Sequence, residues 1–197
     1  MKILFALSAL AGSVVLSLPP SAAPQDPQEM ATALQGAQKY MQPGVHHQVL
    51  KRFLGEWDVE IRFTMGGRST PAEKGKAVFS WLVEGRWLQS TMTGTMLGRP
   101  IEAHSWLGYD NFKQSYVSTR VTSMDTAMAR AEGDMTPDGK ALITYGTIDE
   151  YLTGEHDKMV KYVWRFVGDD EIRLEVHDLP IGEEQTQVVG FTYRRTR

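Results

Sequence analysis

Three arginines with the potential to bind a ligand lie in stretches that alternate between apolar and polar residues, namely Arg86, Arg120 and Arg165. Such stretches form strands, in which successive side chains point to opposite faces. The planar guanidinium group of arginine matches the two oxygens of a carboxylate, so an inward-pointing arginine would hold an acidic ligand. We single out Arg120 for this role. The alternative is that Arg120 points outward and pairs with a carboxylate on a neighbouring strand.

The histidines show no spacing that is typical of a metal site. There are five of them, His46, His47, His104, His156 and His177. Adjacent residues point about 100° apart on a helix, so His46 and His47 would not share a metal ion. The sequence has no H-E-x-x-H motif, and His156 falls in a Gly-Glu-His-Asp segment that is typical of a solvated turn. No metal site is therefore predicted.

Acid–base catalysis would need a histidine or a carboxylate held inside a cavity. His104 is the candidate, but it shares a strand face with Glu102 and Trp106, and this pattern does not decide its direction. An isomerase or hydrolase that works through His104 requires it to point inward, close to a carboxylate, and an outward His104 rejects that hypothesis. The sequence has no Gly-x-Ser-x-Gly or phosphate-loop motif, so no catalytic residue is predicted.

The strand around which the chain is organised is predicted from Trp57 to Met65. Its odd-numbered residues are apolar and its even-numbered residues are polar, which predicts one buried face and one solvent-exposed face. The same pattern recurs between turn signals up to the C-terminus. We predict strands at 57–65, 74–83, 86–96, 101–109, 115–123, 127–135, 140–151, 158–167, 171–178 and 186–195. No helix of βαβ length interrupts them, so we expect an antiparallel sheet that closes into a barrel.

Two helical segments precede this series of strands. Residues Met30 to Met41 contain helix-forming residues and spaced apolar side chains, with Gly36 as a weak point. Residues Val45 to Leu54 carry an apolar stripe at helical spacing and end before Gly55, which suits a helix C-cap. We expect the second helix to lie across one mouth of the barrel as a plug.

Composition and the N-terminal residues limit the partners and the location. The net charge of −3 supplies no basic excess that would bind nucleic acid, and cysteine is absent, which excludes disulfides and thiol chemistry.

Residues 1–23 place Lys2 before an apolar run and end in Ser21-Ala22-Ala23, which predicts a secretory signal peptide. We expect an exported protein, periplasmic or secreted, with no membrane span after signal cleavage. Residues 24–44 would form a leader and helix, and residues 45–197 one barrel domain.

Several motifs between about Val45 and Arg195 together carry a resemblance to a known family. They are His47-x-x-Leu50, Leu54-Gly55-Glu56-Trp57, Gly85-Arg86-Trp87-Leu88, Gly98-x-Pro100-Ile101-Glu102, Leu107-Gly108-Tyr109-Asp110-Asn111 and Thr192-Tyr193-Arg194-Arg195. The chain resembles an uncharacterised bacterial family, known as a domain of unknown function, whose barrel is related to lipocalins and fatty-acid-binding proteins. The resemblance implies an all-β fold, an antiparallel up-and-down calycin-like barrel of about ten strands with one or two N-terminal helices. It also implies a binding habit, without implying a reaction.

The sequence departs from this family pattern at one pair of positions. Where the family usually has a Trp soon after the Gly-Tyr-Asp turn, and an Asp two residues later, this chain has Arg120 and Thr122. If that pair lines the cavity in relatives, this chain binds something different from them, or nothing.

The expected barrel also resembles haem-binding barrels of the nitrobindin type, in which a late-strand histidine is the axial ligand. His177 is the candidate by position. It alternates with Ile172, Leu174 and Val176, so we expect it on the outer face, which argues against haem. No cofactor is predicted.

The sequence as a whole predicts an exported β-barrel that binds a small, hydrophobic or amphipathic molecule. The candidate ligand-binding residues are Trp57, Trp87, His104, Tyr109 and Arg120. For Trp57 the alternative is a core tryptophan that closes the barrel floor. The alternatives for the whole protein are the acid–base enzyme described above and a structural or interaction module, for which we would expect a packed interior without a cavity.

Overall fold

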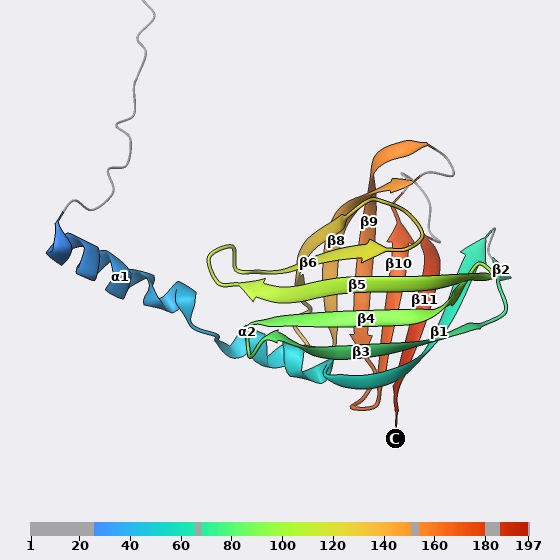
Figure 1. Cartoon of the computed structure of the whole chain (residues 1–197), viewed down its shortest axis with the longest axis horizontal. Coiled ribbons are helices and arrows are strands. Elements are labelled where there is room, and N and C mark those ends of the chain that lie inside the picture. The colour runs from blue at the N-terminus through green and yellow to red at the C-terminus, as the bar shows by residue number, and fades with distance from the viewer. Residues whose placement is uncertain (1–25, 66–67, 151–153, 180–185, 197) are drawn as a thin grey trace, which may run out of the picture. The chain divides into compact units, whose positions relative to one another are not determined.

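The computed structural model describes residues 26–65, 68–150, 154–179 and 186–196. These residues form the helices α1 (Pro27–Met41) and α2 (Val45–Gln48), a 3-10 helix η1 (Val49–Arg52) and eleven strands (Figure 1). The strands are β1 (Gly55–Met65), β2 (Arg68–Ser69), β3 (Glu73–Val83), β4 (Trp87–Met96), β5 (Arg99–Asp110), β6 (Ser115–Thr122), β7 (Ala129–Met135), β8 (Ala141–Glu150), β9 (Glu155–Phe166), β10 (Glu171–Asp178) and β11 (Gln187–Arg195).

Ten of these strands form one closed antiparallel barrel. From β3 to β11 each strand pairs with the next one along the chain, β3 pairs with β1, and β1 also pairs with β11 to close the barrel. The closing pair runs from Trp57 opposite Arg195 to Phe63 opposite Val189. The short β2 pairs with the end of β1. The predicted fold class and the ten predicted strand positions are confirmed, with ends that differ by up to three residues.

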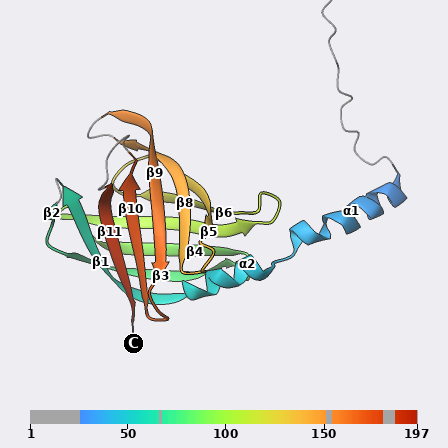
Figure 2. The ribbon, with the colours of Figure 1, turned by 180° about the vertical axis from the view of Figure 1, so that it is seen from behind.

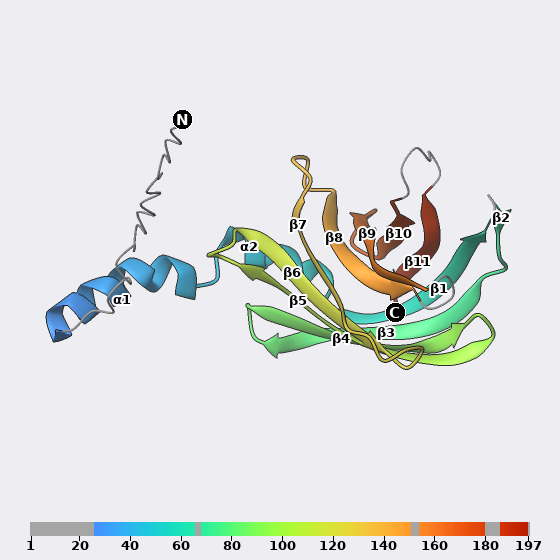
Figure 3. The ribbon, with the colours of Figure 1, turned by 90° about the horizontal axis from the view of Figure 1, so that it is seen from above.

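The barrel is strongly curved, so that strands distant in the sequence face each other. In Figures 1 and 2, β3 to β5 run steeply across the direction of β9 to β11. Seen from above in Figure 3, the sheet curls until β8 to β11 lie opposite β3 to β5. Side chains that alternate inward on these strands therefore meet in one interior.

The strand β1 shows the predicted alternation. Trp57, Val59 and Ile61 are buried, whereas Asp58 and Arg62 are exposed. The strand begins at Gly55, two residues earlier than predicted, and Gly55 has φ +114°, a value that L-residues rarely adopt. A side chain there would also meet Arg195, because a Cβ atom would lie 2.7 Å from its Nη1. Gly55 therefore opens the strand rather than capping the helix.

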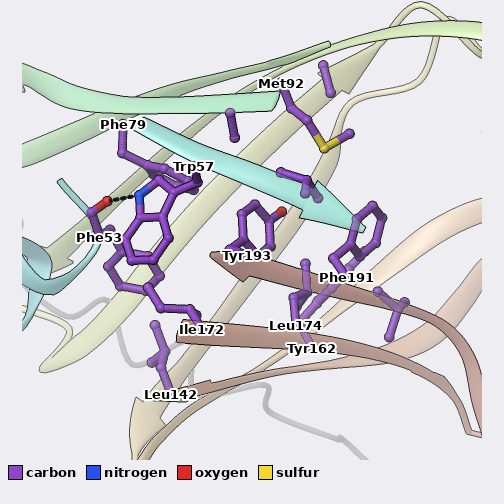
Figure 4. Close-up of a cluster of buried hydrophobic side chains, with 14 of the residues drawn as sticks. Phe53, Trp57, Phe79, Met92, Leu142, Tyr162, Ile172, Leu174, Phe191 and Tyr193 are labelled. Atoms are coloured by element: carbon purple, nitrogen blue, oxygen red, sulfur yellow. Dashed lines mark hydrogen bonds between the residues drawn. The ribbon is translucent and has the colours of Figure 1, made fainter. Parts of the chain in front are cut away.

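The plug consists of α2, η1 and the residues that follow. Leu50 and Phe53 are fully buried, and the Phe53 ring packs against Phe79, Trp164 and Phe166 at centroid distances of 5.7, 5.3 and 5.2 Å. The Trp57 indole N–H donates to the Phe53 carbonyl at 2.7 Å, as Figure 4 shows. This end of the barrel is filled by side chains.

The helix α1 begins at Pro27 instead of the predicted Met30. The carboxylate of Asp26 accepts hydrogen bonds from the backbone N–H groups of Gln28 and Glu29, at 2.7 and 2.8 Å, which makes Asp26 the N-cap and Pro27 the first helical residue. No helix within the described ranges is both long and apolar enough to cross a membrane. The predicted signal peptide, residues 1–23, lies outside the described residues.

Candidate ligand-binding site

A cavity of about 460 Å³ lies inside the barrel, between the plug and the opposite end. Its wall combines strand residues with residues of the β4–β5 and β6–β7 loops, so the cavity reaches the end of the barrel opposite the plug. The apolar part of the wall includes Phe63, Phe79, Met92, Ile101, Ala103, Leu107, Ala131, Trp164, Leu174 and Phe191. The polar part includes Ser90, Ser105, Ser118, Arg120, Thr122, Thr144, Tyr162 and Tyr193. A mostly apolar wall with a few polar groups is typical of a small-molecule site.

Arg120 belongs to the inner face of β6 and lines this cavity. It lies opposite Ser105 on β5 and Ala129 on β7, and Ser105 lies opposite Ser90 on β4. The two serine hydroxyls are 2.7 Å apart. Ser90, Ser105 and Arg120 thus form a polar row across three strands inside the barrel. The alternative that Arg120 points outward to a cross-strand carboxylate is wrong.

The aromatic ring of Tyr162 on β9 lies near the guanidinium group of Arg120. The guanidinium carbon is 5.8 Å from the ring centroid, and Tyr162 is 8% exposed. Among the described residues, the Tyr162 hydroxyl has no hydrogen-bond partner. Burial raises the pKa of Tyr162, and the charge of Arg120 offsets part of this rise. The hydroxyl is therefore protonated at ordinary pH and can donate a hydrogen bond.

Two further features complete the interior around Tyr162. Burial also raises the pKa of Tyr193 on β11, with an opposing effect of Arg120. In Figure 4, Tyr162 and Tyr193 lie near Leu174 and Phe191, on the side of the barrel formed by β9 to β11. Thr144, which lies opposite Tyr162 on β8, is 2% exposed and lines the same cavity. Arg120 is thus positioned next to neutral hydroxyl groups and apolar walls.

The mouth of the cavity is acidic and rich in methionine. Four acidic residues line it, Asp125, Asp149, Glu150 and Asp157, together with the basic residue Arg130. Asp149 also contacts the His156 ring at 3.3 Å. Met96, Met124 and Met128 line the same region, and their flexible thioether side chains adapt to ligands of different shape.

The two tryptophan candidates do not line the cavity. Trp57 is 1% exposed and lies in the core of the plugged end, where Arg195 stacks over its ring at 4.2 Å. Trp87 lies on the outer face of β4, where its ring covers Gly108, since a Cβ atom on Gly108 would be 2.5 Å from the ring. Both therefore act in packing in this structure, and we leave both out of the proposed site.

His104 lies on the outer face of β5. Its Nε2 atom is 2.8 Å from Glu102, its Nδ1 atom is 3.3 Å from the Thr91 hydroxyl, and it is absent from the cavity wall. The acid–base hypothesis required an inward His104, so the structure contradicts it. In the part of the chain that the structure covers, no group of three or more metal-ligating side chains is close enough to hold an ion.

Tyr109 points inward, but at the plugged end. Its ring stacks on His46 at 4.3 Å and meets the ring of Tyr116 edge-on at 4.9 Å. His177 contacts Thr186 and Glu175 on the face of β10 opposite Leu174, as the alternation predicted. Neither residue lines the cavity.

The other two candidate arginines serve the outside of the barrel. Arg86 donates to the backbone carbonyl of Met41, and Arg165 forms an ion pair with Glu175 at 2.8 Å. Sequence reasoning missed Tyr162, although its alternation with Trp164 and Phe166 in β9 places it on the apolar face. It also missed Ser90 and Ser105, which have no distinguishing local pattern.

Comparisons with known proteins agree with the fold. The family model DUF1579, described as a protein of unknown function, matches residues 42–195. The crystal structure of Rv2717c from M. tuberculosis is similar, with a TM-score of 0.55 and 14% identity, over 79% of this chain and 100% of that one. The S-type phycobiliprotein lyase CPES from Guillardia theta is similar with a TM-score of 0.51 and 10% identity, over 76% of this chain and 92% of that one. A search of curated proteins found no match.

Proposed function

The chain belongs to the DUF1579 family, and we propose that its barrel binds a small, partly apolar molecule in the cavity beside Arg120. The observation that carries this proposal is the cavity of about 460 Å³, which is lined by apolar side chains and a few polar groups. Its volume falls within the range of roughly 300–1,000 Å³ that is usual for ligand sites. A barrel that serves only as a scaffold has no need of such a cavity, because side chains fill the interior of small barrels.

Binding is favoured over catalysis by what lines the wall. The histidine on which the enzyme hypothesis rested lies outside the barrel, hydrogen-bonded to Glu102. The acidic lining residues lie at the mouth, whereas the polar groups around Arg120 are hydroxyls, which orient a ligand, and its guanidinium, which stays protonated and is a poor acid or base. The proposed ligand is therefore held without being transformed.

We also propose that the protein acts outside the cytoplasm. The support is the sequence of residues 1–23, in which Lys2 precedes an apolar run and small residues follow. N-terminal sequencing of the protein recovered from a cell fractionation should show a new N-terminus near Ala23. Recovery of the chain with Met1 in the cytoplasmic fraction would refute this part.

A pair of matched variants tests the binding proposal. Ala103 lies on the cavity wall, and Ala103→Phe adds a ring to the cavity. Thr93→Phe adds the same ring on the exposed face of the neighbouring strand β4. Titration with the fluorescent probe 1-anilinonaphthalene-8-sulfonate should show a saturable site in the wild type and in Thr93→Phe, and a loss of at least about tenfold in affinity in Ala103→Phe. Equal binding by all three would place the probe elsewhere and count against the cavity.

A further inference from the structure

We propose that the ligand is an amphipathic monoacid, whose single acidic group binds Arg120 and the Tyr162 hydroxyl inside the barrel while its uncharged end faces the mouth. This inference rests on the proposed function and specifies the ligand of the same site. Three observations carry it, one for the charge, one for the second polar contact and one for the orientation.

The charge follows from the state of Arg120. Among the described residues, Arg120 forms no ion pair with a carboxylate, whereas Arg62, Arg165, Arg173, Arg194 and Arg195 each do. Arg120 contacts the face of Tyr162 and is surrounded by serines, an alanine and apolar side chains. A cation in a mostly apolar cavity is stabilised most by an anion, and the guanidinium fork suits the two oxygens of a carboxylate.

The second contact follows from the Tyr162 hydroxyl. It is buried and lacks a partner among the described residues, and a buried polar group without a partner is costly. The hydroxyl belongs to the ring over which the Arg120 guanidinium lies. An acidic oxygen held by Arg120 is thus in the neighbourhood of this O–H donor. One anion would satisfy both groups.

The orientation of the ligand follows from the charges of the residues that line the mouth of the cavity. Among the described residues that line it, four are acidic, Asp125, Asp149, Glu150 and Asp157, and one is basic, Arg130. A second negative charge at the outer end of the ligand would meet this acidic rim and be repelled. The ligand therefore carries one acidic group, directed inward, and an outer end that is neutral or basic.

Three probes of equal length test the inference by isothermal titration calorimetry of the full-length protein. They are decanoate, decanol and decanedioate, which carry one, no and two carboxylates. The wild type should bind decanoate most tightly, and decanedioate at least about fivefold more weakly. Arg120→Met should weaken decanoate by about tenfold to a hundredfold while decanol changes little, because a hydrogen bond to a charged group is lost. Tyr162→Phe should weaken decanoate by about threefold to tenfold.

Control variants separate the effect of Arg120 and Tyr162 on binding from general effects on the protein. Arg62→Met removes an exposed arginine from the outer face of β1 and should bind all probes as the wild type does. Arg120→Lys keeps the charge without the fork and should give an intermediate affinity for decanoate. Asp125→Asn keeps the oxygen that accepts from the Ala127 N–H group and should strengthen decanedioate binding selectively, most clearly at low salt.

The outcomes distinguish this inference from the proposed function. If decanoate and decanol bind with equal affinity, or if Arg120→Met leaves the affinity for decanoate unchanged, the proposed binding of an acidic group by Arg120 is overturned, while the proposed binding in the cavity stands. If decanedioate binds as tightly as decanoate, the inward orientation of a single charge is overturned. If no probe binds and the anilinonaphthalene sulfonate test also fails, both proposals fall.

Discussion

Truncation of Phe53 should destabilise the barrel strongly, because this side chain joins the plug to the core. Phe53 is fully buried, and its ring meets Phe79, Trp164 and Phe166 at 5.2–5.7 Å. A Phe-to-Ala change at a fully buried site costs about 3–5 kcal/mol, which combines lost burial and the cavity left behind. Since the Trp57 indole bonds to the Phe53 backbone carbonyl, that hydrogen bond is available to the variant. We therefore expect a loss of about 4 kcal/mol.

The assay is equilibrium unfolding in guanidinium chloride, followed by tryptophan fluorescence and by far-UV circular dichroism. The midpoint for Phe53→Ala should fall with little change in slope. The matched control is Phe112→Ala, since Phe112 is 76% exposed and its loss should change the stability by no more than about 0.5 kcal/mol. A loss of less than about 1 kcal/mol in Phe53→Ala would refute the assignment of this residue to the core.

Three further predictions concern the plugged end and the sheet. Burial lowers the pKa of His47 from 6.5, so the unfolded chain takes up a proton at this residue before the folded protein does. The free energy of unfolding should therefore fall as the pH drops below about 6.5, by at most about 1.4 kcal/mol per pH unit. The variant His47→Gln should lose this part of the pH dependence, and an unchanged profile would contradict the prediction. Arg195→Met loses bonds to the carbonyls at the end of the plug, the shortest of 2.6 Å, and its stacking on Trp57, so urea unfolding should show a loss of about 2 kcal/mol, whereas the exposed Arg194→Met should show much less. Gly146→Ala would place a Cβ atom 1.9 Å from a carbonyl oxygen of β7, so its thermal midpoint should fall, and an unchanged midpoint would argue against this strand register.

The fold could be predicted from the sequence because its signals are local and repeated. The alternation from Trp57 to Phe63 indicates which face of the strand is buried, and the turn residues separate one strand from the next. The same logic fails where a strand borders the cavity. In β6 the inward residues Ser118, Arg120 and Thr122 are as polar as many outward residues, because the cavity is partly polar. The alternation of apolar and polar residues in β6 therefore did not decide whether Arg120 points inward or outward.

The candidate site could be predicted only in part, since it depends on which strands face each other. Arg120 was identified from its residue type, whereas Tyr162 lies on a strand three places away in the barrel. The partnerless state of its hydroxyl is a property of the assembled interior, which no stretch of sequence reports. The motif residues Trp87 and Tyr109 illustrate the converse. A recurrent motif residue marks importance without separating packing from binding, and in this structure Trp87 packs on Gly108 while Tyr109 stacks on His46.

The central claim, that the barrel holds a small molecule in its cavity, is tested most directly by native mass spectrometry of the protein purified without denaturation from its natural source. The wild type should carry a reproducible mass excess that disappears on denaturation, and the excess should be reduced or absent in Ala103→Phe, whose added ring enters the cavity. The mass of the released molecule should fit a monoacid. A wild type with the mass of the bare chain, or an Ala103→Phe variant with the same excess as the wild type, would contradict the account.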